Sequence, residues 1–285
     1  MPDFLIVRTV LVTGAEGQLG KQLIRKSIDR GVEVVRLARH DLDITDFDAV
    51  RRRIAEPVTV INCAAYTAVD NAETDADTAY AINETGAANL ARACAEAGAR
   101  LIHVSTDYVF SGTSDRPYEP DDPTGPKTVY GASKLAGERA IAELAPTSTI
   151  VRTAWVYTGV GTDFVATMRR LEAERDIVRV VTDQVGSPTY AADLADGLLE
   201  LAALPEAPLI LHATNDGATS WYEFARAIFG EIGADPDRVQ PTTSAEFVRP
   251  APRPAYSVLS SKAWAAVGLT PLRGWREALH ASVAG

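Results

Sequence analysis

The 285-residue sequence predicts an α/β fold, a doubly wound parallel sheet of the Rossmann type with a smaller C-terminal lobe. Three observations predict it. Short β-branched runs alternate with longer helical patterns through the first half, which favours right-handed crossovers and parallel strands. Runs such as Val58–Ile61 are almost continuously apolar, as a sheet covered on both faces requires. The glycine-rich turn Gly14–Gly20 follows the first strand and opens a helix, the context of a dinucleotide site.

The first half divides into five strands and four helices. We expect the strands at 7–13, 32–37, 58–62, 100–105 and 149–153. The helices are expected at 18–30, 46–55 and 75–97, and in the segment that carries Tyr130. Gly31 and Gly98 end two of these helices, and Thr45 is the expected cap of another.

After about Trp155 the pattern changes to a mixture of elements. We expect helices at 164–174 and 191–204, a helix capped by Ser220 that runs to Phe229, strands at 178–181 and 209–213, a turn at 186–188 and a rigid proline-rich loop at 249–254. The expected domains are therefore residues 1–155, an NAD(P)-binding core to which some later segments return, and residues 156–285, mainly a substrate-binding lobe.

Composition excludes several classes of protein. The net charge of −10 argues against sequence-independent binding of nucleic acid, which needs a basic surface. No stretch approaches the ~20 apolar residues of a membrane span, and Met1–Phe4 lacks the basic start of a signal sequence, so we expect a cytoplasmic protein without membrane contact. Cys63 and Cys94 are expected to be buried thiols rather than a disulfide framework.

The histidines and the paired acids carry no expected chemistry. The four histidines lack metal-ligand spacing, and His103 is expected to be a strand residue with a hydrogen-bonding partner. Asp193 and Asp196 are expected on a solvated helix face. No metal site and no Ser-His-Asp or Cys-His arrangement is predicted.

Tyr130 and Lys134 are the expected catalytic pair. Positions i and i+4 share one face of a helix, so the phenol and the ammonium should point into the same space. A phenol titrates near ~10, and a nearby cation lowers its pKa toward the working range of an acid or base. Thr106 ends the fourth strand at the edge where such sheets bind ligands, and its hydroxyl could hold a substrate carbonyl. A Tyr-x-x-x-Lys pair alone is usually two solvated residues; beside a dinucleotide turn it predicts hydride transfer coupled to proton transfer.

Three strand ends supply the expected cofactor residues. The glycine turn brings backbone N–H groups to the pyrophosphate. No acid stands at the tip of the second strand, and Arg39 could meet a 2′-phosphate, so NADPH is favoured over NADH, with use of both left open. Small residues after the third strand let the cofactor pass close to the backbone. The expected cofactor-binding residues are Gly14, Gly17, Gln18, Leu19, Gly20, Arg39, Asp43, Ile44, Ala64, Ala65, Tyr66, Tyr130 and Lys134.

Several segments together resemble one family. They are residues 14–20, Leu42–Asp46, Val60–Asp70, Ser105–Phe110, Val129–Glu138, Arg152–Tyr157, Asp183–Thr189 and Arg253–Ser257. Over nearly the whole chain the sequence resembles the dTDP-4-dehydrorhamnose reductases of the extended short-chain dehydrogenase/reductase superfamily, which also uses the Gly-x-x-Gly-x-x-Gly spacing.

The resemblance implies an activity and further site residues. The expected reaction reduces the C4 ketone of dTDP-4-dehydro-L-rhamnose to dTDP-L-rhamnose, a precursor of cell-envelope polysaccharide, with Tyr130 as proton donor. The resemblance implies that Asp107 binds the sugar hydroxyls or tunes the acid, that Trp155 packs on the deoxysugar and that Arg253 binds the diphosphate. Lys134 is expected to lower the pKa of Tyr130 and to hold the nicotinamide ribose.

The sequence departs from that family at two places, and rival functions stay open. The acidic residue after the second strand is absent, which puts strict use of NADH in doubt. Some relatives dimerise through a metal held by glutamates, but this chain has Ala192 and Asp193 there, so a monomer or a homodimer without metal is expected. The rivals are a 4,6-dehydratase, a 4-epimerase or another 4-ketoreductase, and a non-catalytic nucleotide-binding regulatory subunit. Tyr108 stands where dehydratases have a glutamate.

Overall fold

The computed structural model describes residues 9–284. The first strand, β1 (Val10–Thr13), begins within this range. Val7 and Arg8 of the expected strand, and the Met1–Phe4 segment without an expected signal sequence, lie outside the described residues.

Six parallel strands form the central sheet, as the alternating pattern predicts. Their order is β10-β5-β4-β3-β1-β2, and every neighbouring pair is parallel. The chain leaves β1 to form β2 on one side and returns to form β3 on the other, so the order reverses between β1 and β3 and a crevice opens there at the carboxyl ends. Besides β1, the strands are β2 (Val34–Leu37), β3 (Thr59–Asn62), β4 (Arg100–Thr106), β5 (Thr149–Thr153) and β10 (Ile210–His212).

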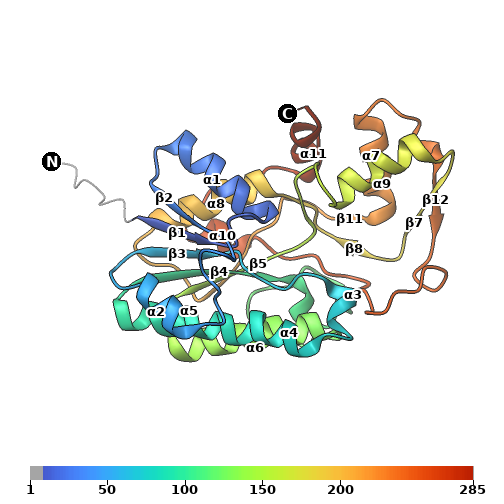
Figure 1. The fold of residues 1–285 in the computed structure, drawn as a ribbon. Helices are drawn as coiled ribbons and strands as arrows, with labels where there is room; N and C mark the ends of the chain where they lie inside the picture. The colour runs from blue at the N-terminus through green and yellow to red at the C-terminus, as the bar shows by residue number, and fades with distance from the viewer. Residues whose placement is uncertain (1–8, 285) are drawn as a thin grey trace.

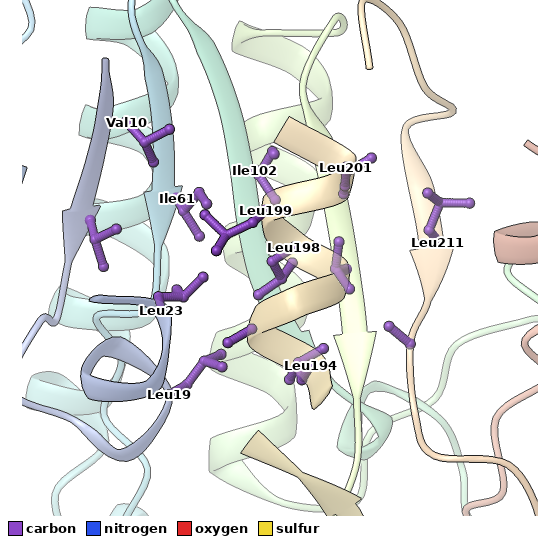
Figure 2. Close-up of a cluster of buried hydrophobic side chains, with 14 of the residues drawn as sticks. Val10, Leu19, Leu23, Ile61, Ile102, Leu194, Leu198, Leu199, Leu201 and Leu211 are labelled. Atoms are coloured by element: carbon purple, nitrogen blue, oxygen red, sulfur yellow. The ribbon is translucent and has the colours of Figure 1, made fainter. Parts of the chain in front are cut away.

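Helices cover both faces of this sheet, which makes it doubly wound (Figure 1). One face carries α1 (Gln18–Arg30), α8 (Ala191–Ala203) and α10 (Lys262–Ala266); the other carries α2 (Phe47–Arg53), α5 (Gly86–Ala97) and α6 (Val129–Leu144). Figure 2 shows the first layer, where Leu198 and Leu199 of α8 lie over Ile61 and Ile102 of the sheet. The alternate strand residues Leu11, Val60 and Leu101 pack under the other helices, so both faces of each central strand are apolar.

The expected helix over 75–97 is one helical segment with a change of winding. It consists of α4 (Ala76–Tyr80), a π-helical turn (Ala81–Thr85) and α5. The π-turn buries Asn83, whose amide binds both backbone polar groups of Tyr66 and the Ser133 hydroxyl. A short helix before it, α3 (Val69–Ala72), was not predicted.

The smaller lobe packs three helices against short strands. The helices are α7 (Phe164–Glu174), α9 (Trp221–Glu231) and α11 (Trp275–Ala284), and the strands are β6 (Val156–Tyr157), β7 (Val178–Val181), β8 (Val185–Gly186), β9 (Thr189–Tyr190), β11 (Thr219–Ser220) and β12 (Val239–Thr242). Ser220 caps α9 as predicted, because its side chain accepts from the Glu223 N–H. The two-residue strands were not predicted, since each is defined by a pairing partner distant in sequence. The strand β12 and the helix α11 were not predicted either.

Three local predictions are wrong. Asp46, not Thr45, caps α2, because the Asp46 carboxylate accepts from the Ala49 N–H. Gly186 is not in a turn but in β8. The solvated face expected for Asp193 and Asp196 is wrong for Asp193, whose side chain is 11% exposed and pairs with Arg273 at 2.6 Å. Asp196 keeps 31% of its side chain exposed and pairs with Lys26 at 2.7 Å, so both carboxylates tie α8 to its neighbours.

Two further properties concern only residues 9–284. No helix there is both long and apolar enough to cross a membrane, and no three His, Cys, Asp or Glu side chains gather as metal ligands. Cys63 and Cys94 are both free thiols; Cys94 is buried, but Cys63 is only partly so.

Candidate active site

A cleft of about 800 Å³ opens at the carboxyl ends of the parallel strands. It runs from the glycine turn between β1 and α1, past the end of β4 and the start of α6, to Trp155 and Trp221 at the smaller lobe. Fifteen predicted site residues line it, namely Gly14, Gly17, Gln18, Leu19, Gly20, Arg39, Asp43, Ile44, Ala64, Ala65, Thr106, Asp107, Tyr130, Lys134 and Trp155. The fold therefore joins segments that are far apart in the sequence.

The glycines of the turn Gly14–Gly20 let its backbone lie close to its neighbours and to a bound diphosphate. Gly14 has φ of 65°, and a Cβ on it would lie 2.6 Å from the Ala64 nitrogen. Gly17 stands at the N-cap of α1, where no side chain caps the helix and no acid lies in the first turn. The free N–H groups of this helix start, together with the positive end of its dipole, suit an anionic group. These residues fit a dinucleotide pyrophosphate.

The turns after β2 line the cleft together with the glycine turn. Asp43 accepts from both the backbone N–H and the hydroxyl of Thr45, and these bonds hold the pKa of its carboxyl below the ordinary value. Ile44 packs against Gly86 of α5, where a Cβ would collide with it. Arg39 also lines the cleft, so a cation faces the place where an adenosine ribose would lie.

Helix α6 begins at the position that brings Tyr130 into the cleft. The Thr128 hydroxyl accepts from the Gly131 N–H and caps the helix. A Cβ on Gly131 would collide with the Tyr108 carbonyl, so this glycine lets the helix start approach the end of β4. The rings of Tyr130 and Tyr108 meet edge to face at 5.5 Å.

The pKa of Tyr130 does not move in the predicted direction. Burial raises it to about 12, and a hydrogen bond with Thr106 offsets this only in part, while the Asp107 charge raises it further. Lys134 does not produce the expected lowering, because its ammonium is directed at the Val104 carbonyl, 2.7 Å away, and at His103. Tyr130 therefore stays protonated at neutral pH, which suits a proton donor.

Lys134 itself is almost fully buried in a chain of polar side chains. Its Nζ lies 3.0 Å from His103 Nε2, and His103 Nδ1 lies 2.9 Å from the Asn62 amide nitrogen. Thr13 donates to the oxygen of the same Asn62 amide. Burial lowers the pKa of Lys134 to about 8, against the opposing effects of Glu138 and Cys63. The prediction that His103 is a partnered strand residue is confirmed.

Thr106 and Asp107 stand together at the end of β4. The Thr106 hydroxyl donates to Asp107 Oδ1 at 2.9 Å and accepts from the Tyr108 N–H. Burial raises the pKa of Asp107 to about 6, although bonds from Ser257 and Thr106 counter it. Asp107 Oδ2 is buried without a hydrogen-bond partner, an orphaned acceptor beside the catalytic pair.

A buried ion pair fixes α6 behind the site. Arg152 of β5 and Glu138 of α6 meet at 2.7 Å, each with 3% of its side chain exposed. Ser105 donates to Glu138, and Arg152 also donates to the Pro120 carbonyl. All the charged oxygens thus have donors, as a buried pair requires.

The wall toward the smaller lobe is aromatic. The rings of Trp155 and Trp221 stack at 3.5 Å and 9°, and Phe164 packs at 4.4 Å behind Trp221. Trp155 has φ of 46°, an unusual conformation for a residue with a side chain. Gly186 is a glycine because the Trp155 ring lies against it, and a Cβ there would fall 2.5 Å from the indole.

Nearly the whole chain matches a known family. The family model described as the RmlD substrate binding domain matches residues 8–285. This chain belongs to the RmlD family. The dTDP-4-dehydrorhamnose reductase of Mycobacterium tuberculosis is 55% identical over 280 residues, which cover 96% of this chain and 92% of that protein. A dTDP-4-keto-6-deoxy-D-glucose reductase of Streptomyces niveus is 45% identical over 272 residues, 94% of each chain.

A solved member of the family has the same fold. The dTDP-4-dehydrorhamnose reductase of Bacillus anthracis, in complex with NADP, is 40% identical and covers 97% of this chain and 99% of its own, with a TM-score of 0.92. The predicted family and the extended short-chain dehydrogenase/reductase fold are therefore confirmed.

Two predicted site residues do not line the cleft: Tyr66, expected from the segment after the third strand, and Arg253, expected from the family resemblance. The Tyr66 hydroxyl donates to Asp75, and its backbone is held by Asn83. Both terminal nitrogens of Arg253 donate to the Asp70 carboxylate at 2.8 Å. Arg253 thus joins the proline-rich loop to α3 at the rim of the cleft, because Asp70 offers two oxygens in the geometry that a guanidinium prefers.

Sequence reasoning missed Trp221 and the polar chain behind Lys134. A tryptophan directly after the helix cap Ser220 was the available signal for the first. Nothing local in the sequence marks Asn62 and His103 as partners, because they stand on different strands, 41 residues apart.

Proposed function

We propose that this protein reduces the C4 ketone of dTDP-4-dehydro-L-rhamnose to dTDP-L-rhamnose, with NADPH as the preferred cofactor and NADH as a possible substitute. The observation that carries the proposal is the meeting of Tyr130, Lys134 and Thr106 on the floor of one cleft that extends from an uncapped helix N-terminus to an aromatic wall. Membership of the RmlD family, and the reductases named among its members, support the choice of substrate.

The residues of this chain bind and orient the two reactants. The turn Gly14–Gly20 would hold the pyrophosphate, and Arg39 would meet a 2′-phosphate, which favours NADPH. When bound, the reduced nicotinamide supplies the hydride to C4. Trp155 and Trp221 would cover the deoxysugar with apolar surface and exclude water. Arg253 could reach a substrate diphosphate only by sharing or leaving Asp70.

Proton delivery falls to Tyr130. The Thr106 hydroxyl would turn from Asp107 to donate its one proton to the substrate carbonyl and hold it beside the phenol. The proton would move from Tyr130 to the carbonyl oxygen as C4 accepts hydride. The raised pKa keeps the phenol protonated until a strongly basic alkoxide develops. Lys134, one helical turn away, would hold the nicotinamide ribose and stabilise the resulting phenolate.

The rivals lack support from this site. Tyr108 occupies the place of a dehydratase glutamate, and burial together with neighbouring charges keeps its pKa above the ordinary value, so it is no base for an elimination. A non-catalytic regulatory subunit would need none of the contacts that Thr106 and Tyr130 make. The proposal keeps the cytoplasmic location and the monomer or homodimer that the sequence led us to expect.

The experiment follows absorbance of the reduced nicotinamide with enzymatically prepared dTDP-4-dehydro-L-rhamnose, using NADPH and NADH in parallel. Stoichiometric oxidation with formation of dTDP-L-rhamnose is expected, faster with NADPH. The Arg39→Ala variant should lose the preference for NADPH. dTDP-4-keto-6-deoxy-D-glucose serves as the competing substrate, and faster turnover of it would reassign the substrate. Folded protein that oxidises neither cofactor with either sugar would overturn the proposal.

A further inference from the structure

The hydrogen-bonded side chains behind Lys134 end at a backbone N–H group, whose role as a donor is fixed. The backbone N–H of Ala64 lies 3.0 Å from one atom of the Asn62 amide, and a backbone N–H is only ever a donor. The atom it meets must therefore be the oxygen, to which Thr13 also donates. The amide NH₂ of Asn62 consequently faces His103, with 2.9 Å between Nδ2 and Nδ1.

This orientation decides the tautomer of His103. An NH₂ group only donates, so His103 Nδ1 must accept and carries no proton. The ring is buried, and burial together with Lys134 holds its pKa well below the ordinary value, so it is neutral. A neutral imidazole with a bare Nδ1 carries its proton on Nε2.

The Nε2–H of His103 then points at Lys134 Nζ, 3.0 Å away. An ammonium has three donors and no acceptor, whereas a neutral amine offers a lone pair. The contact is therefore a hydrogen bond when Lys134 is neutral and a clash of two donors when it is charged. If His103 carried its proton on Nδ1 instead, that N–H would face the NH₂ group of Asn62, and two donors would meet there. If the Asn62 amide were turned as well, its NH₂ group would face the Ala64 N–H, which is also a donor.

Other groups around Lys134 act on its charge as well. Tyr130 and Glu138 stand on the same helix, Cys63 lies at the end of β3 and Asp107 beyond the end of β4. The Glu138 carboxylate favours the charged form of Lys134, but it is already paired with Arg152 and accepts a hydrogen bond from Ser105. Burial raises the pKa of Cys63 to about 12, so this thiol is neutral.

We propose that His103 is a positioning residue of the reduction: held as the Nε2–H tautomer by Asn62, it favours the neutral amine of Lys134 and lets this lysine give up a proton in each turnover. The inference rests on the proposed function. Once Tyr130 has protonated the product, an N–H bond at Nζ breaks and an intervening water relays the proton, so that the O–H bond at Tyr130 forms. Phenolate and ammonium thereby become phenol and amine, the amine accepts from His103, and solvent later returns the proton to Nζ.

The tautomer can be read without any turnover. ¹⁵N NMR of histidine-labelled protein distinguishes Nε2–H, Nδ1–H and imidazolium forms, and with four histidines in the chain the His103 signals can be assigned by substitution. The expected result is a neutral Nε2–H ring through the neutral pH range. An Nδ1–H or imidazolium form would overturn the inference, and because no substrate is present this outcome is independent of the proposed function.

The Asn62→Asp variant keeps nearly the same side-chain shape but reverses the direction of the hydrogen bond between residue 62 and His103. One carboxylate oxygen keeps the bonds from Ala64 and Thr13, and the other requires a donor from His103 Nδ1. We expect His103 to become the Nδ1–H tautomer. Because the pKa of Lys134 is about 8, we expect the alkaline limb of the kcat profile near that pH in the unaltered protein and about one pH unit higher in the variant. A reversed tautomer with an unmoved limb would show that His103 does not act on Lys134.

A second substitution guards against a variant that fails to fold. In His103→Gln the amide oxygen can turn toward Nζ and accept, so the alkaline limb should again rise while KM for the sugar changes little. His280→Gln is the matched control, since His280 lies 72% exposed on α11 beside Glu231 and should leave the profile unchanged. An equal loss of kcat at every pH in His103→Gln would assign His103 a purely structural role.

Discussion

The two walls of the cleft are built on different physical principles. The wall on the parallel sheet is buried and polar: Asn62, His103 and Lys134 are joined by hydrogen bonds between neighbouring strands and α6. The wall on the smaller lobe is aromatic, with Trp155 and Trp221 stacked face to face. A buried hydrogen-bond network admits few arrangements, whereas stacked rings tolerate small shifts. On the proposed function, the comparison teaches that the first wall would fix the chemistry and the second would select and cover the sugar.

The largest expected effect comes from the polar wall. Tyr130→Phe removes the proton donor but keeps the ring that packs on Tyr108, so kcat should fall by about 10³-fold while the melting temperature stays near that of the unaltered protein. Steady-state kinetics and thermal unfolding check this. Tyr222→Phe, on the outer part of α9, is the control and should keep full activity; an active Tyr130→Phe would exclude Tyr130 as the acid.

The ion pair behind the polar wall should dominate its stability. Glu138→Gln leaves the buried Arg152 without its counter-charge, and we expect the free energy of unfolding to fall by about 3 kcal/mol. Denaturant unfolding measures the loss. Glu174→Gln breaks the exposed pair with Arg170 and should cost less than ~0.5 kcal/mol. Equal losses in the two variants would contradict the distinction between buried and exposed pairs.

The aromatic wall should affect binding more than chemistry. Trp221→Leu removes the stacking partner of Trp155, and we expect KM for the sugar nucleotide to rise about tenfold with kcat within a factor of about three. Trp221→Phe keeps a ring there and should recover most of the affinity. A loss confined to kcat would place Trp221 among the groups that act on the transition state, and the contrast between the walls would fail.

The smallest effect concerns Asp107 and runs in the opposite direction. Its folded pKa of about 6 lies above the unfolded value of ~4, so the carboxyl favours folding below pH 4 and this contribution is lost as pH rises through 6. Asp107→Asn should therefore raise the free energy of unfolding by roughly 1 to 2 kcal/mol at pH 8 and leave it unchanged at pH 4. Its turnover should fall. Denaturant unfolding at pH 4 and pH 8 measures both values. An equal gain in the free energy of unfolding at the two pH values would contradict this account.

Much of the polar wall could be predicted because its parts are local. The spacing of Tyr130 and Lys134 places them on one helix face, and the helix that starts at Gln18 and ends before Gly31 follows from its own glycines. The two-residue strands of the smaller lobe could not be predicted, because each is defined by a partner distant in the chain, as β8 is by β11. The predicted role of Lys134 on the pKa of Tyr130 failed because burial depends on everything that surrounds the phenol.

The sequence by itself determined the alternation of strands and helices, the glycine turn and the placing of Tyr130 and Lys134 on one helix face, because each depends on residues within a few positions of one another. Only the tertiary structure decided which groups face Lys134, why Trp155 needs Gly186 beneath it, and that Arg253 is held by Asp70. These depend on contacts between segments 31 to 183 residues apart, whose geometry is fixed only when the sheet and the lobe pack together.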